Sequence, residues 1–129
     1  MTVVLQPWPD LEVDARRGRL HLLAWAGGEL EVGGDLLDQV EFFAPPPDAS
    51  SWILLLARLP RLRWLQLFTD EPGMATLVPD HIAVHGMPGR KWNSHGHHEA
   101  RVFLRRQLAR VARGQEPLHL LRIARPPEA

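Results

Sequence analysis

The chain has 129 residues, no cysteine and a formal net charge of zero, and 45% of its residues are hydrophobic. This length fits a single domain over residues 1–129, and the hydrophobic share is that of a folded globular protein. The lack of cysteine excludes disulfides, thiolate metal sites and thiol catalysis. No apolar run approaches the roughly 20 residues that span a bilayer, and the start of the chain lacks the pattern of a secretory signal. We therefore expect a cytoplasmic protein without a membrane partner.

The charges are unevenly placed along the chain. Residues 1–48 hold nine acidic and three basic side chains, whereas residues 90–129 hold nine basic and three acidic ones. A neutral chain lacks the positive field that gives proteins non-specific affinity for nucleic acid. We therefore expect no nucleic-acid partner, and we expect the two halves of the chain to attract each other.

The first third of the chain predicts two strands and one short helix. Residues 2–6 (TVVLQ) and 19–25 (RLHLLAW) are apolar and β-prone, and Gly27-Gly28 closes the second run. Residues 29–32 could return as a hairpin on that second strand, because a Gly-Gly link suits a tight reversal. The alternative is a parallel arrangement of the first two strands. Asp35 is placed to cap a single helical turn that runs through Gln39.

The middle of the chain predicts a strand, a helix and a second strand. Residues 40–44 (VEFFA) are almost all apolar, which is typical of a strand covered on both faces. Residues 50–59 follow as a helix capped by Asp48 or Ser50, and Pro60 ends it. Residues 64–68 are the next apolar strand. Short connections between these elements favour a parallel crossover.

The last half continues with alternating elements. Residues 71–77 are expected to form a loop with one helical turn, and residues 81–85 a short strand. Residues 98–114 show the clearest helical spacing, with apolar side chains on one face and arginines on the other, and Gly114 is a natural end. Residues 118–123 are a final strand or an extended tail.

Several of these segments resemble a known family. VEFFAPP, LPRLRWLQL and PDHIAVHGMPG, over roughly residues 38–89, are similar in order to the substrate-binding domain of D-isomer-specific 2-hydroxyacid dehydrogenases. RRQLARVARGQEPLHLLR, close to the end, resembles the end of the same domain. In that family an NAD-binding Rossmann domain separates the two parts. Here residues 1–92 would be the N-terminal part, and residues 98–129 the C-terminal helix and tail of a domain that lacks its nucleotide-binding partner.

The resemblance implies a fold and a substrate loop. The fold would be an α/β, flavodoxin-like three-layer domain with a mostly parallel sheet of roughly five strands. The family's substrate loop would fall on Thr69, Asp70 and Gly73. Asp70 and Glu71 would repel an anionic substrate there, and Pro72 removes one backbone donor.

The resemblance also implies where catalysis would lie. The family's catalytic histidine would correspond to His95, within Asn93-Ser94-His95. No G-x-G-x-x-G motif occurs in the chain, so we expect neither NAD nor any other resident cofactor.

One histidine-rich segment stands apart from the resemblance. Ser94–Glu99 reads SHGHHE, so His95, His97, His98 and Glu99 offer ligands suited to zinc or nickel. The alternative is an exposed polar loop that leads into the following helix.

These observations support three functional hypotheses. The first is a degenerate, stand-alone dehydrogenase-like substrate domain that is not an enzyme and acts by forming a homodimer or by binding a partner protein. Loss of a domain would leave apolar surface that a second copy could cover. The second is a residual oxidoreductase, or a subunit of one, that binds a 2-hydroxy or 2-keto acid with a cofactor supplied by another chain. The third is a small histidine-rich metal-binding protein.

Overall fold

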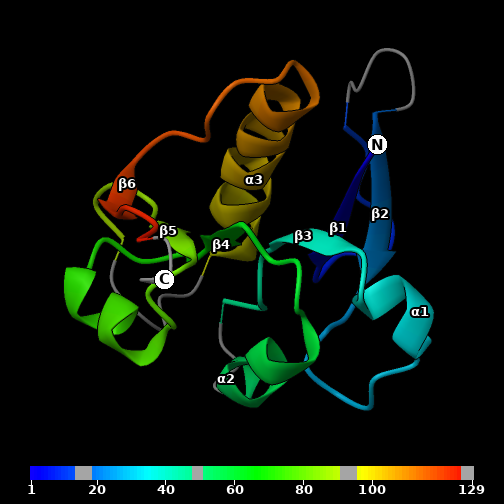
Figure 1. Ribbon diagram of the computed structural model, residues 1–129. Coiled ribbons are helices and arrows are strands. Elements are labelled where there is room, and N and C mark those ends of the chain that lie inside the picture. Colours follow the sequence, from blue (N-terminus) through cyan, green and yellow to red (C-terminus); the bar gives the residue numbers. More distant parts are fainter. Residues whose placement is uncertain (14–18, 48–50, 91–95, 126–129) are drawn as a thin grey trace.

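A computed structural model describes residues 1–13, 19–47, 51–90 and 96–125 of the chain. These residues form one six-stranded sheet in the order β2-β1-β3-β4-β5-β6 (Figure 1). Strands β1 to β5 pair in parallel, and β6 is antiparallel to β5. The strands are β1 Thr2–Gln6, β2 Leu20–Ala24, β3 Val40–Phe43, β4 Trp64–Gln66, β5 Ala83–His85 and β6 Leu120–Arg122. An order of 2-1-3-4-5 is that of flavodoxin-like sheets, which confirms the expected α/β fold and adds a sixth strand to it.

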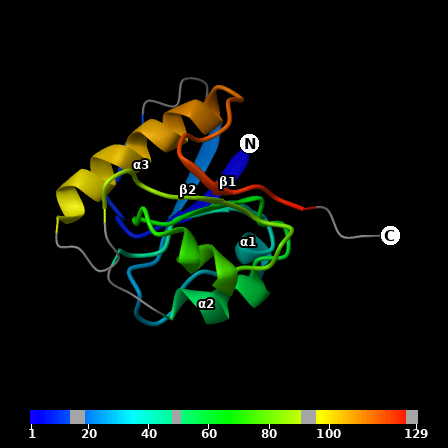
Figure 2. The same cartoon turned by 90° about the vertical axis from the view of Figure 1, so that its left-hand side faces the viewer.

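Helices cover the two faces of the sheet unequally. Of the helices in the described residues, only α3, His97–Ala112, lies on one face. On the other face lie α1 (Gly34–Leu37), α2 (Trp52–Leu55) and two short 3₁₀ helices, η1 (Leu56–Arg58) and η2 (Pro72–Leu77). Figure 2 shows α3 on the opposite side of the sheet from α1 and α2. The three layers thus have two separate apolar cores, one on each face of the sheet.

The central strands β3 and β4 send apolar side chains to both faces of the sheet. In β3, Phe42 packs with the core beneath α3, whereas Phe43 packs with the opposite core, and both side chains are fully buried. In β4, Trp64 and Leu65 divide between the two cores in the same way. Successive side chains of a strand point to opposite faces, so a nearly continuous apolar run suits this position. The prediction of a parallel strand, helix, strand unit from residues 40–68 is confirmed.

The hairpin considered for residues 29–32 is wrong. Strand β2 pairs with β1 in parallel, and residues 29–32 form no strand. Gly27 has a φ of 98°, and the indole nitrogen of Trp25 donates to the carbonyl of Gly28 at 3.0 Å, so the chain turns away from the sheet. Leu30 and Val32 then pack against the core on the side of α1. Burial of these two side chains decided the path of the segment.

The helix predicted for residues 50–59 is shorter than its sequence pattern. The described part begins as α2 at Trp52 and tightens into η1, which ends at Arg58. Leu59 leaves the helical region, with φ −120° and ψ 71°, as expected for a residue before proline. The proposed caps, Asp48 and Ser50, lie outside the described residues.

The remaining elements differ from their predictions mainly at the ends. The strand expected over residues 64–68 stops pairing at Gln66, and the one expected over 81–85 begins at Ala83. The helix predicted for residues 98–114 is α3, and residues 118–123 contain β6 rather than only an extended tail. In the described part of the chain, none of the helices has the length and apolar character needed to cross a membrane.

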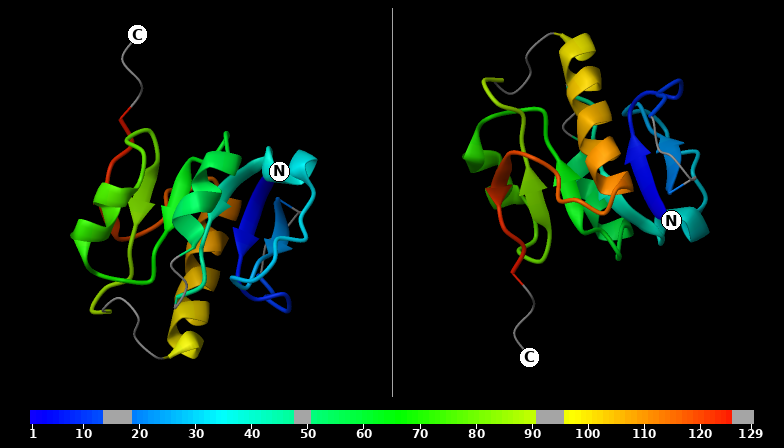
Figure 3. Two further views of the ribbon diagram at one scale, coloured as in Figure 1. Left: turned by 90° about the horizontal axis from the view of Figure 1, so that it is seen from below. Right: turned by 90° about the horizontal axis from the view of Figure 1, so that it is seen from above.

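Helix α3 does not extend over the whole sheet. Its buried side chains share a core with residues of β1, β3 and β4. Seen from above, α3 crosses the middle strands, and β5 and β6 lie to one side of it (Figure 3). Among the described residues, β5 contributes only the half-buried Ala83 to this core and β6 contributes none, so β6 lies beyond the part of the sheet that α3 covers.

Candidate functional site

The loop after β4 contains the residues assigned to a substrate loop. Thr69 is fully buried, and its carbonyl accepts a hydrogen bond from the amide of Met87 at 2.9 Å. The backbone N–H of Asp70 donates to the carbonyl of Arg90 at 2.5 Å, and the N–H of Glu71 donates to Oγ1 of Thr69 at 3.2 Å. The structure thus places Thr69 and Asp70 beside the loop that follows β5. Two amides that an anion could have used are already bonded within the chain.

Gly73 follows these two residues in the next element of the chain. It is exposed, belongs to η2, and its carbonyl accepts a hydrogen bond from Thr76 at 2.8 Å. The assignment of Thr69, Asp70 and Gly73 to one substrate loop stays a prediction.

Asp70 pairs with a histidine that the sequence did not single out. Its Oδ1 lies 2.7 Å from Nε2 of His119, and its Oδ2 accepts from the amide of Gly89 at 3.2 Å. The hydrogen bond from His119, followed by that from Gly89, lowers the pKa of Asp70 below its ordinary value. His119 has a φ of 57°, a conformation that histidine adopts more readily than most residues. No pattern in the strand-like segment LHLLRI indicated this partner.

His85 lies at the end of β5 and is buried. Desolvation lowers its pKa to about 4, while the charge of Glu116 and a hydrogen bond to the backbone of Pro117 act in the opposite direction. Its Nδ1 is buried and has no hydrogen-bond partner among the described residues. His85 is therefore a neutral imidazole near pH 7.

Two buried glutamines hold the segment between α3 and β6. Nε2 of Gln107, on α3, donates to Oε1 of Gln66, on β4, and to the carbonyl of Leu118, both at 2.8 Å. Oε1 of Gln107 accepts from the amide of Leu118 at 2.7 Å. Gln66 in turn donates to the carbonyls of Leu67 and Gly86. With the Asp70–His119 pair, these bonds set the position at which β6 begins.

The described contacts of Asp70 and His119 give them a structural role. General acid–base catalysis needs a reacting group within hydrogen-bond reach of the acid or base. Both carboxylate oxygens of Asp70 are occupied by groups of the chain, and the neighbouring Thr69 hydroxyl is buried. The pair joins the loop after β4 to the start of β6.

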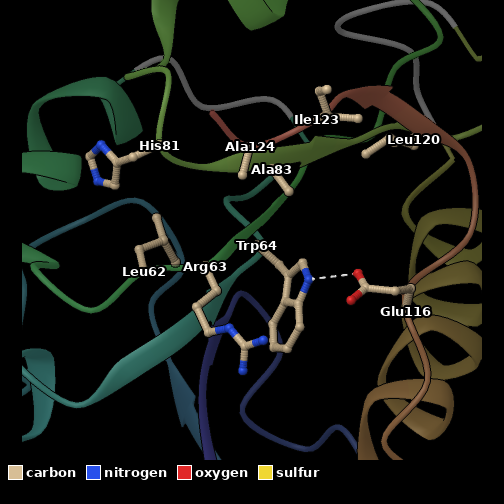
Figure 4. A pocket seen from close by; sticks show the side chains of 9 residues that line it. All are labelled: Leu62, Arg63, Trp64, His81, Ala83, Glu116, Leu120, Ile123 and Ala124. Atoms are coloured by element: carbon tan, nitrogen blue, oxygen red, sulfur yellow. Dashed lines mark hydrogen bonds between the residues drawn. The ribbon is translucent and has the colours of Figure 1, made fainter. Parts of the chain in front are cut away.

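A pocket of about 370 Å³ opens near the amino ends of β4 and β5, between the end of α3 and β6 (Figure 4). The indole nitrogen of Trp64 donates to Oε2 of Glu116 at 3.1 Å, and the Arg63 guanidinium lies 4.1 Å from the centre of the Trp64 ring. The other residues that line the pocket are mostly apolar: Leu62, His81, Ala83, Leu120, Ile123 and Ala124. The pocket is suited to an apolar group flanked by polar contacts.

The histidine-rich segment lies at the start of α3. His95 lies outside the described residues, so neither its proposed catalytic role nor its metal-binding role is tested. His97, His98 and Glu99 occupy the first turn of α3, and the His97 ring meets that of Trp8 with centroids 6.4 Å apart. Within the described ranges, no three His, Cys, Asp or Glu side chains gather closely enough to hold a metal ion. The hypothesis of a zinc or nickel site that includes His95 stays a prediction.

No family of known proteins, no curated protein and no solved structure matches the chain.

Proposed function

We propose that the protein is a non-catalytic α/β association domain, which pairs with a second copy of itself through β6 and the adjacent sheet face. The observation that carries this proposal is the apolar surface at β6. Leu118, Leu120 and Ile123 have exposed fractions of 46%, 50% and 61%. Leu120 and Ile123 also line the pocket beside Trp64 (Figure 4). A cluster of exposed apolar side chains around a pocket is typical of a protein-interaction surface.

The position of β6 favours a second copy as the partner. Within the described part of the chain it is an outermost strand of the sheet and pairs with β5. Edge strands offer backbone groups to an added strand, and two identical edges can pair around a twofold axis. Because β6 has only three residues, the apolar side chains must supply much of the contact.

The opposite edge is less suited to this role. Leu20, Leu22 and Leu23 of β2 are half-buried and pack against the cores of their own chain. Pairing there would bury little additional apolar surface, so we place the interface at β6.

The proposal includes descent from a dehydrogenase-like substrate domain. The flavodoxin-like strand order supports this origin, as do the ordered sequence resemblances on either side of residues 90–98. Without a dinucleotide-binding motif, the retained part would have kept its fold and exchanged catalysis for association.

Sedimentation velocity over a range of protein concentrations tests the proposal. We expect a dimer for the natural chain and a monomer for a variant that carries Leu120→Glu and Ile123→Glu, because the dimer would bury four unpaired carboxylates, two from each copy. Leu54→Glu is the matched control, since Leu54 is 81% exposed on α2 and lies on the other face of the sheet. A natural chain that stays monomeric at high concentration contradicts the proposal. Dissociation by Leu54→Glu alone would place the interface elsewhere.

A further inference from the structure

Helix α3 and the residue that follows it carry a basic surface, formed by Arg105, Arg106 and Arg113. All three side chains are exposed and make no ion pair within the described part of the chain. Their spacing places them on the side of the helix away from the buried Leu104 and Leu108. Two further arginines of α3 are engaged, because Arg101 bonds Asp10 and Arg110 bonds the carbonyl of Glu116.

An acidic surface lies on the other face of the sheet, over the segment from β2 to α1. It consists of four exposed carboxylates that make no ion pair with a described residue: Glu29, Glu31, Asp35 and Asp38. Leu30, Val32 and Leu37, which alternate with them, pack into the core on the side of α2. This packing turns the charged side chains outward.

The two charged surfaces cannot neutralise each other within one molecule. They lie on opposite sides of the sheet, as α1 and α3 do in Figure 2. Among the ion pairs of the described residues, Arg101–Asp10 joins the acidic first part of the chain to α3, and it uses neither surface. Among the described residues, the expected attraction between the two halves of the chain is thus represented by the Arg101–Asp10 pair, outside both surfaces.

We propose that the acidic surface of one molecule docks on the basic surface of α3 in another copy. This inference deepens the proposed function, since it rests on a chain that works by self-association. The two surfaces differ, so the contact is head-to-tail and does not close on itself as a twofold pair does. Together with pairing through β6, it would link dimers into larger assemblies. Because one chain carries both an acidic and a basic surface, a second copy of this chain is the partner whose charges best match either surface.

Salt dependence distinguishes this contact from the apolar one. Exposed charges are screened over about 10 Å at 0.1 M salt and over about 3 Å at 1 M. We expect species larger than a dimer in sedimentation velocity at about 0.02 M salt and their loss at about 0.5 M, with the dimer remaining.

Charge reversal tests the two surfaces separately. A variant with Arg105→Glu and Arg106→Glu should lose the larger species, with association at least about tenfold weaker. A variant with Glu29→Lys and Glu31→Lys should lose them to a similar extent. An equimolar mixture of the two variants should recover them, because each then offers a surface complementary to the other. Arg58→Glu with Arg61→Glu is the control, since it makes the same change in net charge at exposed arginines outside α3.

The outcomes separate this inference from the proposed function. A salt-resistant dimer without larger species at low salt overturns the charged contact and leaves the β6 dimer standing. Salt-sensitive association that persists in the Leu120→Glu, Ile123→Glu variant supports the charged contact. If the natural chain is then monomeric at about 0.5 M salt, the β6 dimer is contradicted while the charged contact stands. Equal loss in the Arg58→Glu, Arg61→Glu control, or failure of the mixture to recover association, also overturns the charged contact. Binding of a DNA duplex through Arg105 and Arg106, without self-association, would assign the basic surface to nucleic acid instead.

Discussion

The side-chain amide of Gln107 on α3 donates a hydrogen bond to Oε1 of Gln66 on β4 at 2.8 Å, and both glutamines are fully buried. The same Gln107 bonds both backbone groups of Leu118. A helix, a central strand and the segment leading to β6 are therefore joined through one side chain.

Replacing Gln107 by leucine should destabilise the protein strongly. The substitution preserves approximate size but leaves the buried Oε1 of Gln66 and the partly buried backbone groups of Leu118 without these partners. A buried unsatisfied group costs about 1–3 kcal/mol, and a partly buried one costs less. We expect a loss of about 3 kcal/mol in the free energy of unfolding, measured by urea denaturation. Gln39→Leu is the control, because Gln39 is exposed and its one side-chain bond is to the carbonyl of Asp35. An equal effect of the two substitutions would contradict this explanation.

Arg122 should be needed for the local structure between β4 and β5. Its guanidinium donates to the carbonyls of four residues in and after η2: Ala75, Val78, Pro79 and Ile82. Arg122→Met removes these donors while keeping the aliphatic stem, and we expect about 2–4 kcal/mol of destabilisation. Hydrogen exchange should show faster exchange at the amides of η2 and β5. Arg125→Met, at an exposed neighbouring position, is the control and should change neither the stability nor the exchange rates. Normal exchange at the amides of η2 in Arg122→Met would refute this role for the Arg122 guanidinium.

Acid should destabilise the fold through His85. Burial lowers the pKa of His85 to about 4, so the unfolded chain binds a proton more readily than the folded one. The stability provided by the neutral imidazole is complete above the ordinary histidine pKa of 6.5 and falls as the pH drops from there towards about 4. The loss over this range is up to about 3 kcal/mol. His85→Gln should flatten the pH profile of unfolding over this range; an unchanged slope would show that another group titrates.

Gly86 should be intolerant of a side chain. A Cβ at this position would lie 2.4 Å from the carbonyl oxygen of Thr69 and 2.7 Å from Cδ1 of Leu121, so the loop after β4 or β6 would have to move. We expect Gly86→Ala to cost about 3 kcal/mol in a thermal or chemical denaturation experiment. Gly73→Ala is the matched control, since nothing lies within 4 Å of a Cβ there. Similar stability of the two variants would show that the loops at Gly86 adjust freely.

The order and type of most elements followed from local patterns. Strand β1 has the predicted residues, and α3 differs from its prediction by one residue at the start and two at the end. In α3 the helical period of the apolar side chains explains the agreement, and in β1 a short run of β-prone apolar residues does. The 29–32 segment shows the limit of this reasoning, because a Gly-Gly pair permits a hairpin without requiring one. Burial of Leu30 and Val32 in a distant core decided against it.

The candidate sites were harder to predict than the fold. Asp70 was singled out for a loop, but its partner His119 directly precedes β6, on the far side of α3 in the sequence. Glu116 likewise reaches Trp64 across 52 residues. Neither residue belongs to a motif with characteristic spacing, so no pattern in the sequence identifies these pairs.

By itself, the amino-acid sequence determined an α/β chain, built from apolar strands too continuous to face water and one long helix with an arginine-rich side. These properties are local, since hydrophobic periodicity and breaking residues act over a few neighbouring positions. Only the tertiary structure decided which polar groups meet, that β6 adds no side chain to the core beneath α3, and that the acidic and basic surfaces lie on opposite sides of the sheet. The physical reason is that contacts between distant segments depend on how the sheet orders its strands, and strand order is a property of the whole chain.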